Sequence, residues 1–471
     1  MSKTNKFNPL QLPSSIFIGL LTFCFGIFYF ILHEVYGIFH LPFFWDELGV
    51  YSQSALYMAD HDLSILPASV PDNISRGHPL IATFLYSIGF KVLGTKLWVA
   101  KFSSILIYFV GILYCFRTIR LFTNPFWAFL LSLVIFIQPI FIAQSLMILP
   151  ELLLASLTII ALFYYLKENY IPCIIAICLA VLTKESGLVL PIAFGLTHLV
   201  LTRKKLQSLS LFGIPIAVFG LFLVIQKMQN GYFLYPLHES LINFQWHNIL
   251  VKINELWEFI FHLQGRTFFT YGIIITLLIY FFRDKIIPYV QREKKLFLLV
   301  VLIFIGGFTF SMINFYLARY SLFFLMPLFL LAVVFISKLN KWSRVIFSIL
   351  LIIIGIQNLD NKEKFVDSDM AYVAHIKSQE KAFDYIRENI PLKDSVGYNW
   401  PMSMTFWNRN MGYDLPKCTY LELYNNKPIT SKYIVISEPG EAIEKEKILK
   451  DYVQFKEFKV DYARVTLYRR K

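Results

Sequence analysis

The sequence predicts an all-α polytopic membrane protein, with about eleven transmembrane helices, that ends in a small α/β domain. Hydrophobic residues make up 57% of the 471 residues and charged residues only 16%, and the mean hydropathy is +0.58. A soluble protein of this length would carry more charge. Apolar runs of roughly 15–20 residues recur along the chain, which is close to the length that a helix needs to cross a bilayer.

The apolar runs also predict where the helices lie. The first run is longer than the core of a signal peptide and no small-residue cleavage site follows it, so we interpret it as a retained helix. The expected spans lie near 14–33, 97–117, 125–148, 150–166, 171–185, 187–202, 209–227, 268–283, 295–314, 320–337 and 343–358.

Basic residues cluster in alternate loops, as in Arg203-Lys204-Lys205 and the group Lys338, Lys341 and Arg344. This pattern predicts a cytoplasmic N-terminus and an outer C-terminus. The Lys-, Asn-, Ile- and Phe-rich composition suits an AT-rich bacterial genome, so we expect a multi-pass protein of the bacterial inner membrane. An endoplasmic reticulum membrane would give the same topology. The net charge of +13 sits largely in these loops and does not indicate nucleic-acid binding.

Two regions are predicted. Residues 1–358 form a membrane domain with long outer loops at 34–96 and 228–267, where the half-apolar stretches 80–93 and 249–261 predict helices lying in the interface. Residues 359–471 form an outer, periplasmic α/β domain with balanced charge, 19 Lys and Arg against 17 Asp and Glu. Its predicted helices are 378–388 and 441–452, and its predicted strands are 395–398, 433–437, 455–460 and 464–468.

Several classes of site are excluded by the sequence. Four of the five cysteines lie in apolar runs and no CxxC occurs, so neither a disulfide framework nor a cysteine zinc site is indicated. The phosphate-loop, dinucleotide, HExxH and GxSxG motifs of soluble enzymes are missing. A site on the outer face would also have no ATP or nucleotide sugar to use.

The predicted topology gathers ionisable residues at the outer face, where charge near the bilayer is costly and indicates function. Asp46 and Glu47 are adjacent carboxylates just after the first span, suited to a general base or a metal ligand. They could instead cap an interfacial helix. The full set is Asp46, Glu47, Arg76, His78, Glu151, Lys184, Glu185, His262, Arg266 and Arg319.

Lys184 and Arg319 depart from the trend that keeps basic residues inside. Each could bind an anionic lipid phosphate, or could simply extend its charge to the outer head groups. Glu151 follows Pro150 at a helix start, where it either complements the helix dipole or faces Asp46 across a cavity. Asp46 and Glu151 together could hold Mg²⁺ or Mn²⁺, although no cofactor is certain.

The order of the outer-face motifs resembles the GT-C superfamily of integral membrane glycosyltransferases, especially the protein O-mannosyltransferase and lipid A aminoarabinose transferase group. Glu151 stands where that group more often has Asp, Leu80 replaces a second proline, and Lys101 replaces a common arginine. The resemblance covers about residues 10–340. It rests on Asp46-Glu47, Arg76-Gly77-His78-Pro79-Leu80, Leu93-Gly94, Val99-Ala100-Lys101-Phe102-Ser103, Pro150-Glu151, Leu182-Thr183-Lys184-Glu185-Ser186-Gly187, and Arg319-Tyr320 through Pro327.

The resemblance implies inverting transfer of a sugar from a polyprenyl-phosphate donor to a lipid, glycan or protein acceptor. Asp46 would be the base that activates the acceptor, with Glu47 and Glu151 supporting it as catalytic carboxylates. His262 and Glu185 would be secondary residues of the site. The donor phosphate would be bound by Arg76, His78, Lys184, Arg266 and Arg319.

Two other functions remain open from the sequence. A lipid or sugar transporter should show internal repeats and helices broken near the middle of the membrane, and no repeat is visible. A polysaccharide polymerase or ligase should place its large loop late in the chain, whereas here a long loop comes first.

Overall fold

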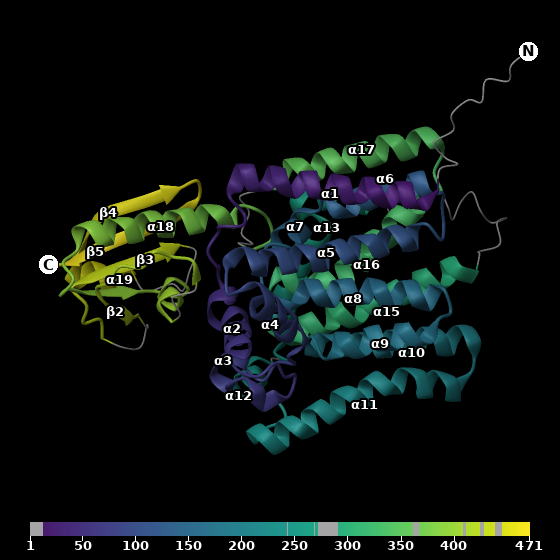
Figure 1. Cartoon of the computed structure of the whole chain (residues 1–471), viewed down its shortest axis with the longest axis horizontal. Helices are drawn as coiled ribbons and strands as arrows, with labels where there is room; N and C mark the ends of the chain where they lie inside the picture. The colour runs from purple at the N-terminus through teal and green to yellow at the C-terminus, as the bar shows by residue number, and fades with distance from the viewer. Residues whose placement is uncertain are drawn as a thin grey trace, which may run out of the picture.

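The computed structural model shows a bundle of long helices with a separate sheet at one end (Figure 1). The start of α1 and the C-terminal sheet lie at opposite ends of the bundle. The residues that the structure describes are 13–242, 244–267, 269–271, 291–360, 367–407, 411–423, 428–438 and 445–471.

The helical region follows the predicted spans closely. Its elements are α1 (Ser14–Tyr36), η2 (Glu47–Tyr51), α2 (Ser52–Asp60), η3 (Pro67–Ser69), α3 (Asp72–Ser75), α4 (Ile81–Leu93), α5 (Leu97–Ile119), α6 (Pro125–Phe136), α7 (Pro139–Gln144), α8 (Pro150–Leu166), α9 (Tyr170–Val181), η4 (Glu185–Leu188), α10 (Val189–Thr202), α11 (Lys205–Asn230), α12 (Pro236–Leu241), α13 (Trp246–Phe261), η5 (Leu263–Gly265), α15 (Gln291–Ile313), η6 (Ala318–Ser321), α16 (Leu322–Ile336) and α17 (Lys341–Gln357). Here η2 is a π-helix, and the other η elements are 3₁₀-helices.

Within the described ranges, six helical stretches are long and apolar enough to cross a membrane, which confirms the predicted class. They are Ser14–Tyr36, Leu97–Ile119, Glu185–Thr202, Lys205–Asn230, Arg292–Ile313 and Ala318–Ile336. The other predicted spans are shorter helices, apart from 268–283, which lies almost wholly outside the described residues. The total of eleven spans stays a prediction.

One predicted span is wrong in detail. The stretch 125–148 was expected to be a single helix, but α6 ends at Phe136 and α7 begins at Pro139. Proline has no N–H to donate and its ring clashes with the preceding turn, so an unbroken helix is unfavourable here. Gln138 compensates partly, because its side-chain amide donates to the Val134 carbonyl at 2.9 Å.

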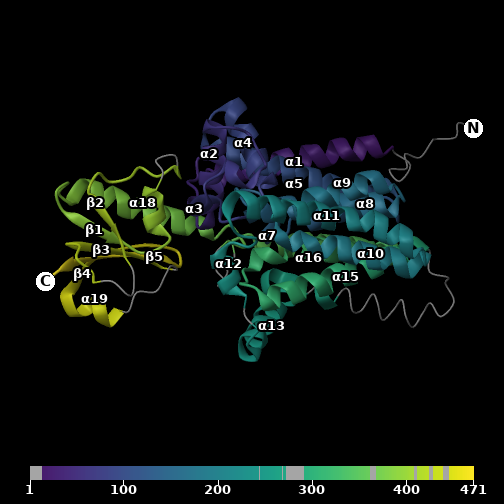
Figure 2. The same cartoon turned by 90° about the horizontal axis from the view of Figure 1, so that it is seen from below.

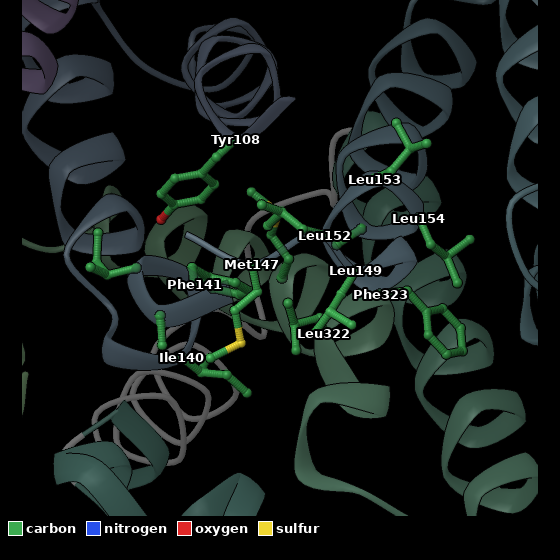
Figure 3. Packing of buried hydrophobic residues seen from close by; sticks show 14 of the residues in the cluster. Tyr108, Ile140, Phe141, Met147, Leu149, Leu152, Leu153, Leu154, Leu322 and Phe323 are labelled. Carbon is green, nitrogen blue, oxygen red and sulfur yellow. The ribbon is translucent and has the colours of Figure 1, made fainter. Parts of the chain in front are cut away.

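The core of the bundle surrounds α16. In the apolar stretch that contains α16, 89% of the residues are buried, compared with 28% for α1 and for α11. A helix that is apolar on every side belongs in the interior, whereas the exposed apolar faces of α1 and α11 suit contact with lipid. Figure 3 shows Tyr108 of α5, Phe141 of α7, Leu152 of α8 and Leu322 of α16 converging on this core.

Helices α5 and α8 approach each other closely because small residues meet between them. A side chain at Gly111 would place its Cβ 2.6 Å from the Ser156 hydroxyl oxygen. Ser156 in turn donates to the Ile107 carbonyl at 3.2 Å. Small residues at such crossings are typical of membrane helix packing. The close contact lies near the N-terminal end of α8, where Glu151 lies.

The C-terminal sheet has five strands in the order β2-β1-β3-β5-β4. Strands β1 (Ser395–Tyr398), β2 (Thr419–Glu422) and β3 (Tyr433–Glu438) are parallel neighbours, while β5 (Ala463–Arg470) runs antiparallel to β3 and to β4 (Tyr452–Val460). Helices α18 (Tyr372–Asn389) and α19 (Lys445–Asp451), with η7 (Met402–Phe406), complete the region. The predicted small α/β region is confirmed, and β2 is the strand that the sequence did not reveal.

The central strand β3 explains why both sheet faces are covered. Side chains alternate between faces along a strand. Val435 joins the main core, which includes Phe383 of α18, whereas Ile434 and Ile436 pack in a second cluster with Ile448 of α19.

Opposite ends of the bundle carry different charges. At the end distant from the sheet, Lys295 pairs with Glu168 and Lys338 pairs with Glu293 at 2.6 Å. The basic cluster 203–205 also lies at this end, between α10 and α11 (Figures 1 and 2). We call it the basic end. The loops that contain α2, α3 and α12 lie at the sheet end.

Candidate active site

Asp46 is positioned by contacts with the C-terminal region. The Phe43 amide donates to the Met411 carbonyl at 2.9 Å, and the Trp45 ring meets the Trp400 ring edge-to-face at 4.6 Å. Trp45 adopts a φ of 55°, so the backbone turns sharply before η2 begins. This turn leaves the Asp46 side chain at the wall of a cavity.

Its neighbour Glu47 points the other way, into the protein. Its carboxylate accepts hydrogen bonds from the Phe44 amide at 2.9 Å and the Ile148 amide at 2.8 Å, and Lys101 lies 3.3 Å away. Burial raises the pKa of the Glu47 carboxyl above its usual range, and the Lys101 charge opposes that rise. Glu47 is fully buried and does not line the cavity. The geometry therefore gives the two adjacent carboxylates different surroundings.

Arg319, in η6 just before α16, is the centre of a buried ion network. Its guanidinium forms ion pairs with Asp46 and with Asp367, and its Nε lies 3.4 Å from Glu151 Oε1. Only 1% of Arg319 is exposed. A planar guanidinium can hold several carboxylates at once because its donors form a fixed fork. Arg319 thus joins the loop after α1, the start of α8 and the segment that follows α17.

Lys184 adds a second cation to this network. Its ammonium donates to Glu151 at 2.6 Å and lies 3.5 Å from the centre of the Tyr320 ring. Lys184 lines the cavity, whereas Glu151 and Arg319 lie behind the wall. The structure therefore brings together four predicted residues, Asp46, Glu151, Lys184 and Arg319. Of these four, Asp46 and Lys184 face the cavity.

The cavity has a volume of about 370 Å³ and two kinds of lining. One part is charged or polar, with Asp46, Arg76, His78, Lys184, Glu185 and His238. The other part is apolar and includes Phe219, Phe222 and Leu223 of α11 and Phe310 of α15. A ligand with a charged head and an apolar tail would match such a site.

The two long loops 34–96 and 228–267 touch at the cavity. Arg76 (φ 50°) ends α3 in the left-handed region, and Gly77 follows with a φ of 67°. A side chain at Gly77 would place its Cβ 3.1 Å from Tyr235 Cβ, so glycine permits the close approach. Arg76 is half-buried and lines the cavity.

His78 and Glu185 form a pair at the same edge. His78 Nδ1 lies 3.0 Å from Glu185 Oε1, and the His78 ring lies 4.5 Å from the ring of His238. Burial, followed by the charge of His78, lowers the pKa of the His238 imidazole to about 4. His238 was not identified from the sequence, where an isolated histidine in a loop gives no signal.

Two predicted residues lie elsewhere. Arg266 is fully buried, donates to the Phe259 carbonyl at 2.6 Å and to Gln264 at 2.8 Å, and does not line the cavity. His262 is exposed at the end of α13 and does not line the cavity either. Arg266, predicted to bind the donor phosphate, and His262, predicted as a secondary residue, therefore lie apart from the cavity, and their roles stay predictions.

Asp367 was also missed from the sequence, although one signal was present. It begins an Asp-Ser-Asp sequence soon after the last predicted span, as Asp46-Glu47 follows the first span. Its partner Arg319 could not be recognised because the two are 48 residues apart.

Asp46 and Glu151, the two carboxylates that could hold Mg²⁺ or Mn²⁺, do not fit a metal ion in this arrangement. Arg319 contacts both Asp46 and Glu151, and Lys184 also pairs with Glu151. A divalent cation between these carboxylates would lie against one or two positive side chains. We therefore derive no chemistry from a metal at this position.

Comparisons with known proteins agree with this architecture. Residues 77–228, about a third of the chain, match the family model described as dolichyl-phosphate-mannose-protein mannosyltransferase. This range contains His78, Glu151, Lys184 and Glu185. No curated protein sequence matches the chain.

The structure is similar to that of ArnT from Cupriavidus metallidurans. The crystal structure of ArnT bound to undecaprenyl phosphate matches with a TM-score of 0.58 at 13% identity, over 96% of this chain and 97% of that chain. The apo structure of ArnT gives 0.55 at 14% identity, over 95% and 98%. The predicted GT-C fold is therefore confirmed.

Proposed function

We propose that this chain, a membrane glycosyltransferase with the GT-C fold, moves a sugar from a polyprenyl-phosphate donor to a lipid, glycan or protein acceptor. The observation that carries the proposal is the two-part cavity, whose apolar wall suits a polyprenyl chain and whose charged wall suits a sugar phosphate. ArnT, which shares the fold, was crystallised with undecaprenyl phosphate.

Lys184 and Arg76 are the cations that would bind the donor phosphate. Both line the charged part of the cavity. The lipid phosphate gains negative charge as it leaves, and fixed cations in a site of low polarity stabilise that charge. The pair with Glu151 and the Tyr320 ring hold the Lys184 ammonium in place.

Asp46 would act as the base. One carboxylate oxygen pairs with Arg319, and the other makes no hydrogen bond with the part of the chain that the structure describes. That oxygen takes the proton from the acceptor hydroxyl or amine, whose heavy atom then attacks the anomeric carbon. The bond from that carbon to the phosphate oxygen breaks, and the lipid phosphate leaves with the electron pair. A single displacement of this kind inverts the anomeric configuration.

The site would face the outer side of a bacterial inner membrane. The charge pattern supports this orientation, because the basic end lies opposite α12, whose residues line the cavity, and basic loops favour the cytoplasm. In this orientation the N-terminus is cytoplasmic and the C-terminal region periplasmic. A lipid-linked donor brings its reactive phosphate ester with it, so no nucleotide is required.

The first experiment removes the proposed base. We expect Asp46→Asn to lower sugar transfer by about 10²–10⁴-fold, the usual contribution of a general base. Membranes from the host, labelled with radioactive sugars, supply the polyprenyl-phosphate donors. The purified protein is placed in nanodiscs, and the measurement is the amount of radioactive label that it transfers to acceptor. Asp62→Asn is the matched control, because Asp62 is exposed in the same loop and does not line the cavity.

Each outcome bears on a different part of the proposal. Wild-type activity in Asp46→Asn would remove the role of Asp46. No transfer by the wild-type protein from any polyprenyl-phosphate donor would remove the donor class. Chromatography of the product separates transfer of one sugar from the polymerase or ligase alternative, which would give long chains. The family match and the fold already favour a transferase over a transporter.

A further inference from the structure

Three side chains that can bind a metal ion meet at the edge of the cavity. They come from separate parts of the chain: His78 follows α3, Glu185 begins η4, and His238 lies in α12. One ligand atom from each side chain lies within 4.8 Å of the other two. Across the described ranges, no other group of three or more such residues is this close.

One of the three distances already matches that in a bound zinc site, and the other two are within 4.8 Å. Zinc binds imidazole nitrogen and carboxylate oxygen at about 2.0–2.2 Å, so neighbouring ligand atoms in a tetrahedral site are roughly 3.3 Å apart. His78 Nδ1 and Glu185 Oε1 are already 3.0 Å apart. The centres of the His78 and His238 rings are 4.5 Å apart, so a small side-chain rotation would complete the set.

His238 is suited to the third position. Its ring packs against the rings of His78 and Tyr235. Neither ring nitrogen makes a hydrogen bond with a described residue, so a nitrogen lone pair remains available for a ligand. A plain ion pair between His78 and Glu185 would not require this second histidine.

We infer that His78, Glu185 and His238 bind one zinc ion, or a similar divalent transition metal, with a fourth position open to the cavity. Two imidazoles and one carboxylate suit zinc, whereas Mg²⁺ and Ca²⁺ prefer oxygen ligands. All three residues line the cavity, so water or an anionic oxygen can reach the fourth position. The ion would link α12 of the second long loop to the first long loop and to η4.

This site goes beyond the proposed sugar transfer and does not depend on it, because metal binding is measured without donor or acceptor. The full-length protein is purified in nanodiscs, treated with a chelator, and dialysed against Zn²⁺. Bound zinc is then measured by mass spectrometry of the metal. We expect about one tightly bound zinc per wild-type chain, which millimolar Mg²⁺ does not displace.

Substitution of His238 identifies the site. We expect His238→Ala to lower zinc affinity at least 100-fold and to remove the increase in melting temperature that zinc gives the wild-type protein. His262→Ala is the control and should bind zinc as the wild type does, because His262 is exposed in the same long loop and lies outside the cluster. Equal zinc binding in wild type and His238→Ala would overturn the inference.

His238→Cys separates a ligand from a structural residue. A thiolate is also a good zinc ligand, so this variant should retain zinc, and its Co²⁺ form should gain a sulfur-to-cobalt charge-transfer band. Loss of zinc in the alanine variant with retention in the cysteine variant supports the site. Equal loss in both variants, or a wild-type protein that retains no zinc, would contradict it.

Discussion

The two ends of the helical bundle both contain ion pairs, but the pairs are of different kinds. At the basic end, Lys295 pairs with Glu168, whose side chain is 61% exposed. At the sheet end, Arg319 and its carboxylate partners lie in the interior, and Arg319 itself is 1% exposed. Charges in water contribute little to stability, whereas buried charges must be neutralised by neighbours.

This difference suggests how the molecule divides its functions. Each ion pair at the basic end keeps one partner in contact with water, Glu168 at 61% exposed and Lys338 at 35%, and basic residues in such loops set orientation in a membrane. The sheet end retains charges that are costly to bury, and it does so around a cavity lined by both cations and carboxylates. The comparison can be tested by substitutions at each end.

The largest effect is expected for Arg319→Ala. This change leaves Asp46, Asp367 and Glu151 without their shared cation, and breaking a buried ion pair costs about 3–5 kcal/mol. We expect a much lower melting temperature and poor recovery of monodisperse protein. Arg292→Ala, at the basic end, is the control and should behave as the wild type. Equal melting temperatures for both variants would show that the ion pairs at the two ends do not differ in how much they stabilise the protein.

Glu47→Gln should be nearly as costly. Lys101 would remain buried without an anionic partner, which again costs about 3 kcal/mol or more. Sugar transfer per folded molecule should change much less than in Asp46→Asn, because Glu47 does not line the cavity. Thermal unfolding and transfer activity, measured on the same samples, test this separation. A Glu47→Gln protein that is stable but inactive would show that Glu47 takes part in the chemistry.

Acid should weaken the sheet end through His375. Burial lowers the pKa of His375 from 6.5 to about 4, so the folded form keeps the ring neutral while the unfolded chain takes up a proton. The stability linked to this residue is complete above pH 6.5 and is lost as the pH falls towards 4, by up to about 3 kcal/mol. In His375→Phe, the melting temperature should depend less on pH between these two values. An unchanged pH profile in the variant would exclude His375 as the cause.

Asp367→Asn should have an intermediate effect. The variant loses one charged partner of Arg319, and a hydrogen bond to a charged group contributes about 1.5–3 kcal/mol. Because Arg319 also holds Asp46, we expect reduced transfer as well as a lower melting temperature. Asp384→Asn, on the exposed side of α18, is the control in the same region. Full activity in Asp367→Asn would show that Asp46 keeps its position without this contact.

The smallest effect is expected for Glu168→Gln at the basic end. Lys295 is only 9% exposed, but Glu168 is 61% exposed, so water still reaches the pair and we expect a contribution of about 1 kcal/mol or less, which salt screens further. The melting temperature and the transfer activity should therefore match the wild type. A large loss of stability would show that the basic end also depends on specific ion pairs.

Much of the fold could be predicted from the sequence because hydrophobic length and period are local signals. The spans 14–33 and 97–117 correspond to α1 and α5, and strand 395–398 corresponds to β1. The break before Pro139 was missed because the apolar run continues across it. Strand β2 was missed because most of its four residues are exposed and show no alternation of burial.

The candidate site was predictable in part. The order of the motifs identified Asp46, Glu151, Lys184 and Arg319, which the structure brings into one network. It also suggested Arg266 and His262, which lie away from the cavity. Spacing along the chain cannot separate these cases, because a cation in an outer loop has the same sequence pattern whether or not it faces the cavity.

By itself, the sequence determined that this chain is a helical membrane protein with a GT-C fold. Hydrophobicity and motif order can be recognised without knowing which residues are in contact. Only the tertiary structure decided which of two adjacent carboxylates faces the cavity. It also decided that Asp367 and His238 join residues far away in the chain. The physical reason is that charge pairing and ring contacts act over a few ångströms in space, and chain separation does not report that distance.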